Sequence, residues 1–158
     1  MSHPIAQKLV VCCDHAGFEL KEHLKNHLDK QGVTVIDAGC YSADSVDYPK
    51  IVENAVAQMG DNSVEYGLFI CGSGVGVMIG ANRYPHIRAT IAHDVSTAVM
   101  SRRHNNTNVL CLGARVVAQP RAEEILDAWL CEPFEADRHT LRVNQLGELG
   151  AAPSACSV

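Results

Sequence analysis

The stretch FICGSGVG, residues 69–76, predicts the end of a strand and the turn that follows it. A short apolar run leads directly into Cys71 and then into a turn with three glycines, which is typical of a buried strand followed by a tight connection to a helix. Backbone N–H groups that glycine leaves accessible can hold a developing oxyanion, and a helix N-terminus favours a thiolate. The alternative is a buried strand-end cysteine followed by an ordinary turn.

Strand-like and helix-like segments alternate on both sides of this turn. With short connections between them, the alternation predicts a single-domain, doubly wound (Rossmann-like) α/β fold, in which a parallel five-stranded sheet has helices on both faces. In such sheets ligands bind at the carboxyl ends of the strands. The patterns predict strands at residues 8–13, 33–38, 66–71, 88–92 and 108–112, and helices at 18–30, 48–59, 75–82, 96–103, 120–130 and 134–146.

The domain is expected to span residues 8–146. Residues 1–7 form a short N-terminal extension, and residues 147–158 are rich in Gly, Ala, Ser and Pro, which predicts a flexible C-terminal tail. The sequence contains no internal repeat and no interdomain linker.

Composition excludes several classes of protein. A chain of 158 residues with 47% hydrophobic residues can bury its own core. The formal net charge of −5 argues against broad nucleic-acid binding, and the apolar stretches fall short of the about 20 residues that a membrane span requires. Residues 1–7 lack the basic start and apolar core of a signal peptide, so we expect a cytoplasmic protein that binds neither nucleic acid nor membrane.

Seven cysteines form an odd set without C-x-x-C spacing and without histidines at zinc-finger intervals. We therefore expect neither disulfides nor structural zinc. Cys12, Cys13 and Cys111 lie in strand-like apolar runs, where small buried side chains are expected.

The glycine-rich turn does not match the common nucleotide-binding motifs. G-x-G-x-x-G fails because its third glycine position is Val77 or Ile79, and no G-x-x-x-x-G-K-[S/T] occurs. A smaller phosphorylated ligand stays open, because short strand-to-helix loops can bind a phosphate without either motif.

Five motifs in fixed order carry a family resemblance: CDHAGF at 13–18, DYP at 47–49, CGSGVG at 71–76, RHNNTN at 103–108, and Arg138-His139 with Arg142. Together they resemble the ribose-5-phosphate isomerase B family, whose wider group includes the galactose-6-phosphate and allose-6-phosphate isomerases. The resemblance covers about residues 8–145. It implies a cofactor-independent aldose–ketose isomerase that interconverts ribose 5-phosphate and ribulose 5-phosphate, with no metal.

Aldose–ketose isomerisation needs a base that moves a proton from C2 to C1, donors that stabilise the cis-enediolate, and a group that opens the furanose ring. Cys71 is the candidate base, and the Ser73 hydroxyl is a candidate for assisting proton movement. Some relatives carry a glutamate base elsewhere in this loop, where the present sequence is apolar. The oxyanion donors are expected from the backbone N–H groups of Gly72, Ser73, Gly74 and Gly76.

The resemblance assigns ring opening to His104 and contact with the enediolate or a sugar hydroxyl to Asn105. In the family this pair comes from the neighbouring subunit, which implies a homodimer or homotetramer with shared sites. A solvated histidine near a helix end and a capping asparagine are the alternatives.

The remaining candidates would bind the sugar and its phosphate. Asp14 and His15 follow the first predicted strand, where a helix N-cap is the alternative for the aspartate. Arg138 and Arg142, four apart, are predicted to lie on one helix face, and guanidinium groups suit phosphate. A residue packed on the sheet edge is the simpler alternative for Tyr48. The predicted substrate-binding residues are Asp14, His15, Tyr48, Gly72, Gly74, Gly76, Asn105, Arg115, Arg138, His139 and Arg142.

Two further functions stay open at this point. A six-carbon substrate, allose 6-phosphate or galactose 6-phosphate, differs from ribose 5-phosphate by one hydroxymethylene group. A non-catalytic sugar-phosphate-binding subunit would use the same scaffold without needing Cys71 and His104. The presence of both residues favours the isomerase.

Overall fold

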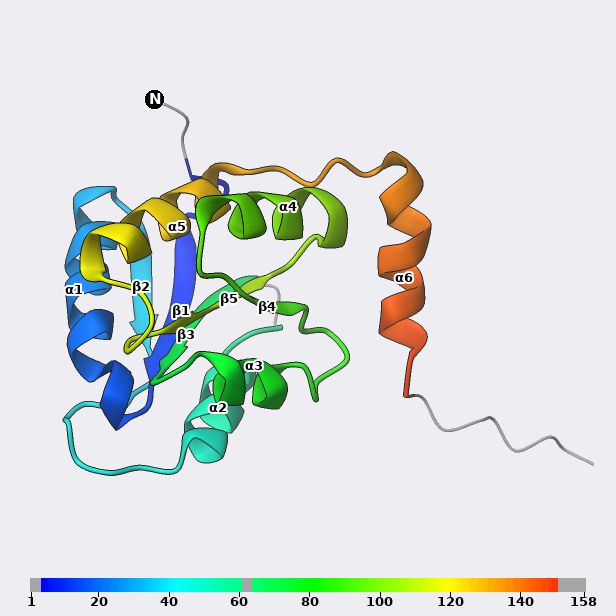
Figure 1. Cartoon of the computed structure of the whole chain (residues 1–158). Helices are drawn as coiled ribbons and strands as arrows, with labels where there is room; N and C mark the ends of the chain where they lie inside the picture. Colours follow the sequence, from blue (N-terminus) through cyan, green and yellow to red (C-terminus); the bar gives the residue numbers. More distant parts are fainter. Residues whose placement is uncertain (1–3, 61–63, 151–158) are drawn as a thin grey trace, which may run out of the picture.

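The computed structural model describes residues 4–60 and 64–150. Five strands form one sheet in which every pair is parallel, in the order β2-β1-β3-β5-β4. The predicted fold class and single-domain architecture are therefore confirmed (Figure 1). The strands are β1 (Lys8–Cys13), β2 (Thr34–Asp37), β3 (Tyr66–Cys71), β4 (Ala89–Ile91) and β5 (Val109–Gly113).

Helices α1, α4 and α5 cover one face of the sheet, and α2 and α3 cover the other (Figure 1). The described helices are α1 (Phe18–Lys30), α2 (Tyr48–Ala57), α3 (Val75–Ala81), α4 (Val95–Asn105), α5 (Gln119–Cys131) and α6 (Thr140–Glu148), with short 3₁₀ turns at His15–Gly17 and Asp137–His139.

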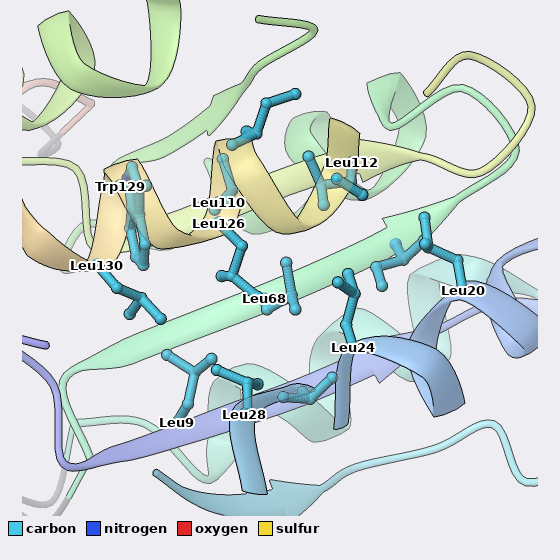
Figure 2. Packing of buried hydrophobic residues seen from close by; sticks show 14 of the residues in the cluster. Leu9, Leu20, Leu24, Leu28, Leu68, Leu110, Leu112, Leu126, Trp129 and Leu130 are labelled. Carbon is cyan, nitrogen blue, oxygen red and sulfur yellow. The ribbon is translucent and has the colours of Figure 1, made fainter. Parts of the chain in front are cut away.

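Strand side chains alternate between two hydrophobic cores. Leu9 and Val11 of β1 face the core under α1 and α5, whereas Val10 and Cys12 face the core under α2 and α3. In the first core, leucines of α1 and α5 pack on leucines of β1, β3 and β5 (Figure 2). Fully burying each such leucine contributes about 2 kcal/mol. Leu9, Leu24, Leu28, Leu68, Leu110, Leu126 and Trp129 are all completely buried.

The strand order reverses between β1 and β3, because β1 connects toward one edge of the sheet and β3 toward the other. At such a reversal the two following loops diverge over opposite faces and leave a crevice at the carboxyl ends of the strands. The loops after β1 and β3 are the ones that carry Asp14 and Cys71.

The last predicted helix is wrong at its start. Residues 134–136 are not helical, and α6 begins only at Thr140. Ala136 and Asp137 have φ values of 59° and 42°, and this left-handed backbone breaks the helix that the apolar pattern predicted. At its other end α6 continues through Glu148, past the predicted start of the tail at residue 147, and residues 151–158 lie outside the described residues.

Helix α6 buries none of its side chains within its own chain. It stands apart from the sheet and its covering helices (Figure 1). Leu141 and Leu149 are 66% and 70% exposed. No helix among residues 4–60 and 64–150 is long and apolar enough to cross a membrane.

Candidate active site

Cys71 is the last residue of β3 and lies at the mouth of the glycine turn. Its side chain is buried, and its Sγ accepts a hydrogen bond from the backbone N–H of Gly74 at 3.1 Å. Gly74 has φ 82°, and a Cβ there would lie 3.0 Å from the backbone carbon of Leu112. Only glycine therefore allows the turn to bring this N–H onto the sulfur.

The end of β5 closes over the same turn. The backbone N–H of Ala114 donates to the carbonyl of Cys71 at 2.9 Å, and that of Arg115 donates to the carbonyl of Gly72 at 3.0 Å. The Arg115 guanidinium lies against Gly72, because a Cβ at Gly72 would be 3.2 Å from Nη1. Arg115 thus stands beside the cysteine turn, as predicted.

The loop after β1 forms the other wall of the crevice. The Asp14 Oδ1 accepts hydrogen bonds from the N–H groups of Ala16 at 2.9 Å and Gly17 at 3.1 Å, so the capping role is present. Both bonds use the same oxygen, so capping and ligand binding can coexist on one carboxylate. The adjacent His15 accepts the N–H of Val46 on Nδ1 at 3.3 Å, which ties the loop before α2 to this edge.

Tyr48, the first residue of α2, also reaches the glycine turn. A Cβ on Gly76 would lie 2.9 Å from the Tyr48 ring carbon Cζ, so the ring rests directly on the glycine. The tyrosine is 38% exposed. Predicted site residues gathered at the carboxyl edge of the sheet are Asp14, His15, Tyr48, Cys71, Gly72, Ser73, Gly74, Gly76 and Arg115.

A second group of predicted residues gathers around the end of α4. The His104 and His139 rings stack with centroids 4.4 Å apart and 13° between their planes. The Nε2 atom of each ring lies 3.8 Å from Oε2 of Glu135. Arg138 Nε donates to His139 Nε2 at 3.3 Å. Burial, followed by the neighbouring His104 and Arg138, lowers the pKa of His139.

Arg102 fixes the backbone around this group. It is 2% exposed, and its Nη1 donates to Asn106 Oδ1 at 3.1 Å and to the Thr107 carbonyl. Its guanidinium carbon lies 5.7 Å from the centre of the Trp129 ring. Asn106 ends α4 in the left-handed conformation with φ 46°, so the buried arginine holds the turn that follows His104.

Two residues of this second group were not predicted, and one prediction about it was wrong. Glu135 was missed, and the only signal for it was its place four residues before His139. Arg102 was missed because a buried arginine cannot be distinguished from a surface one in a helical pattern. Arg138 and Arg142 do not share one helix face, because Arg138 lies in the 3₁₀ turn before α6 and Arg142 in α6 itself.

The two groups lie at opposite ends of the strands, the first at their carboxyl ends and the second at their amino ends. Helix α4 joins two parallel strands, so it runs back from their carboxyl ends to their amino ends. Asn108, four residues after His104, accepts the N–H of Gly67 near the start of β3, whereas Cys71 ends that strand. Four strand residues span about 13 Å. One chain therefore does not bring His104 to its own Cys71.

Cys12, Cys13, Cys40, Cys71 and Cys111 are free, buried thiols. The expected burial of Cys12, Cys13 and Cys111 is confirmed. Burial raises the pKa of Cys111 far above its ordinary value, with a smaller contribution from Cys71, and the same effect of burial acts on Cys12. Buried thiols of this kind are inert structural side chains.

Comparison with known proteins identifies close relatives over nearly the whole chain. The profile of the family described as Ribose/Galactose Isomerase matches residues 9–146. Ribose-5-phosphate isomerase B of Escherichia coli K12 is 41% identical over 140 residues, which cover 89% of this chain and 94% of that protein.

Solved structures agree with the sequence comparison. A crystal structure of a ribose 5-phosphate isomerase from Thermotoga maritima superimposes with a TM-score of 0.87 at 40% identity, covering 90% of this chain and 98% of the other. The structure of ribose-5-phosphate isomerase B from Mycoplasma genitalium with bound ribulose-5-phosphate gives a TM-score of 0.85 at 33% identity, with 89% and 94% coverage.

Proposed function

The chain belongs to the ribose/galactose isomerase family, and on that basis we propose that it interconverts ribose 5-phosphate and ribulose 5-phosphate through a cis-enediolate. The observation that carries the proposal is the Cys71 thiol at the carboxyl edge of the sheet, with the Gly74 N–H directed at its sulfur. Side chains suited to a sugar and its phosphate surround it.

In the proposed reaction, Cys71 is the base. As the thiolate it removes the proton from C2 of the open-chain aldose and returns it to C1, while charge develops on the substrate oxygens. The N–H groups of the glycine turn stabilise that charge, and the N–H of Gly74 holds the sulfur at the end of β3. The Ser73 hydroxyl lies in the same turn, where it accepts the Val75 N–H at 3.3 Å, and assists proton movement between the two oxygens.

Ring opening and much of the phosphate binding come from the second group. His104 transfers the proton that opens the furanose ring, and Asn105 holds the enediolate. Because this group lies at the far edge of its own sheet, a working site combines Cys71 of one chain with His104 of another. The exposed leucines of α6, which carries Arg142, support association through this part of the chain.

The phosphate is bound by Arg115 at the cysteine turn together with Arg138 and Arg142 from the second group. Guanidinium groups bind phosphate oxygens in pairs and keep their charge at all working pH values. His15 and His139 complete the contacts. Asp14 and Tyr48 contact the sugar hydroxyls through the side-chain atoms that the cap and the glycine turn leave to the crevice.

Turnover of three sugar phosphates tests the proposal. Purified chain is assayed with ribose 5-phosphate, allose 6-phosphate and galactose 6-phosphate in EDTA, and ribose 5-phosphate is expected to be the best substrate. Cys71→Ala is expected to lower turnover about a thousandfold while retaining substrate binding. The matched control is Cys111→Ala, which removes a buried thiol from the neighbouring strand and is expected to keep turnover.

Preference for a six-carbon substrate would change the substrate but keep the reaction. Sugar-phosphate binding by a folded chain that turns over none of the three compounds would instead identify a binding subunit. Near-normal turnover by Cys71→Ala would remove the cysteine from the proposed role.

A further inference from the structure

The cluster of His104, Glu135 and His139 has the composition of a transition-metal site. Its ligand atoms, one from each residue, all lie within 4.8 Å of one another. Imidazole nitrogen and carboxylate oxygen are among the donors that Zn²⁺ takes in proteins, and three protein ligands leave a fourth position open to water. We propose that this cluster binds one Zn²⁺ ion per chain.

The distances require little rearrangement. Zn–N bonds of about 2.0–2.1 Å at a tetrahedral centre place neighbouring donor atoms about 3.3 Å apart. In the structure both imidazole Nε2 atoms lie 3.8 Å from the same Glu135 oxygen. Rotation of the stacked rings about their own bonds to Cβ turns the two nitrogens toward a common point, and such torsions are soft.

The backbone that carries the three ligands is held in place. The N–H of Glu135 donates to the carbonyl of Arg103, the residue before His104, at 3.1 Å. The Arg103 side chain in turn bonds the carboxylate of Glu132 at 2.5 Å. The three ligands come from segments about thirty residues apart that these bonds lock together, which is why no local motif predicted the site.

One neighbouring side chain, Arg138, disfavours Zn²⁺ binding. Arg138 donates from Nε to the His139 Nε2 at 3.3 Å, so its hydrogen bond occupies the lone pair that a metal would take, and its charge repels a cation. Zn²⁺ binding must displace this guanidinium. Removing the Arg138 side chain is therefore expected to tighten Zn²⁺ binding, the opposite of its expected effect on a phosphorylated substrate.

The site has a consequence that rests on the proposed function. His104 is the proposed ring opener, and an ion on its Nε2 takes the lone pair needed for proton transfer. Zn²⁺ is then an inhibitor of the isomerase, and a chelator restores the activity.

Direct binding is the test, measured calorimetrically with Zn²⁺ and EDTA-stripped full-length protein in the absence of substrate. Glu135→Gln and His139→Ala are each expected to weaken binding at least about tenfold. Arg138→Ala is expected to strengthen it. The matched control is His23→Ala, which removes a partly exposed histidine that pairs with Glu123 at 2.7 Å on another face, and unchanged binding is expected.

Wild-type affinity in both Glu135→Gln and His139→Ala, or an equal loss in His23→Ala, would overturn the site. A Co²⁺-loaded protein adds a spectroscopic check. Nitrogen and oxygen ligands give weak visible bands, whereas a dominant thiolate charge-transfer band would place the ion on cysteine and refute the proposal. Because binding is read without substrate, failure of the proposed isomerase activity leaves this result independent. Binding that does not inhibit would count against His104 as ring opener, not against the ion site.

Discussion

His104 and Cys71 have separate tasks in the proposed reaction, and the difference can be measured at single residues. Ribose 5-phosphate is mostly a closed furanose, whereas ribulose 5-phosphate has no furanose form because its C5 oxygen carries the phosphate. Only the reaction that starts from ribose 5-phosphate therefore needs its ring opened first.

His104→Ala is expected to lower kcat/KM about 100-fold and to change how the rate depends on enzyme concentration. With ribose 5-phosphate the rate should level off as variant enzyme is added, because spontaneous ring opening becomes limiting. With ribulose 5-phosphate the initial rate should stay proportional to enzyme. The control is His93→Ala, which alters an exposed histidine just after β4 and should behave as wild type. Proportional rates in both directions would move His104 from ring opening to another step.

For single residues, the sequence predicted which side chains belong to the candidate site better than it predicted which side chains lie next to each other. The thiol before a glycine turn and the arginine after β5 could be found because the carboxyl ends of parallel strands meet at one edge of the sheet, whereas Tyr48 was found through the family resemblance. The Glu135 carboxylate beside two imidazoles could not, because it depends on how residues 132–139 fold back on the end of α4.

Among the helices and strands, β5 packs directly against the glycine turn that follows Cys71. A Cβ on Gly113, the last residue of β5, would lie 2.5 Å from the Ser73 carbonyl oxygen and 2.6 Å from its carbon. Both are backbone atoms, which cannot rotate away as a side chain would.

Gly113→Ala is therefore expected to push the turn out of position, lowering the free energy of unfolding by about 1–3 kcal/mol and reducing turnover. The comparison is Gly80→Ala in α3, where the added methyl would only contact Val52 at 3.4 Å and should gain about 1 kcal/mol of helix propensity. Denaturant unfolding and kcat/KM measure both. Wild-type turnover in Gly113→Ala would show that the turn tolerates displacement.

The bounds of helices and strands were predicted most closely where the apolar residues follow one clear pattern. The bounds of β1, β3 and α1 match the sequence patterns, since each has an unbroken apolar run or stripe. The start of α6 was wrong because an apolar pattern says nothing about φ, and two consecutive positive-φ residues without glycine give no sequence signal.

For the whole molecule, the separation of the two residue groups by the length of the sheet gives the sharpest prediction. If each site combines Cys71 of one chain with His104 of another, two variants that are each defective with ribose 5-phosphate as substrate should complement each other. Cys71→Ala and His104→Ala proteins, mixed and allowed to exchange subunits, form mixed dimers with one intact site and one doubly defective site.

Random exchange is expected to restore about a quarter of wild-type turnover, because half of the dimers are mixed and each has one working site. Mixing Cys71→Ala with itself is the control, and it should stay inactive. No recovery after verified exchange would mean that both residues act within one chain. The same arithmetic on a tetramer built from such dimers gives the same recovery.

The overall architecture was predictable because alternation of strands and helices leaves few topologies, and right-handed connections select among them. The sharing of the site between two chains was predicted only from the family resemblance. The predicted alternation of strands and helices did contain a signal for it, because a helix that joins two parallel strands runs back to their amino ends and carries His104 there. Where α6 comes to lie could not be predicted.

Helix α6 also bears on the fate of the protein in a cell. A single chain exposes Leu141 and Leu146 on α6 and Leu149 directly after it, on a helix that its own fold leaves uncovered. Apolar surface of this kind is what chaperones retain and proteases remove, so, if the chain associates through α6 as proposed, the lifetime of a newly made chain depends on how soon it assembles. Under the same proposal, the chains that escape degradation are the assembled ones, and these are also the chains whose active sites are complete.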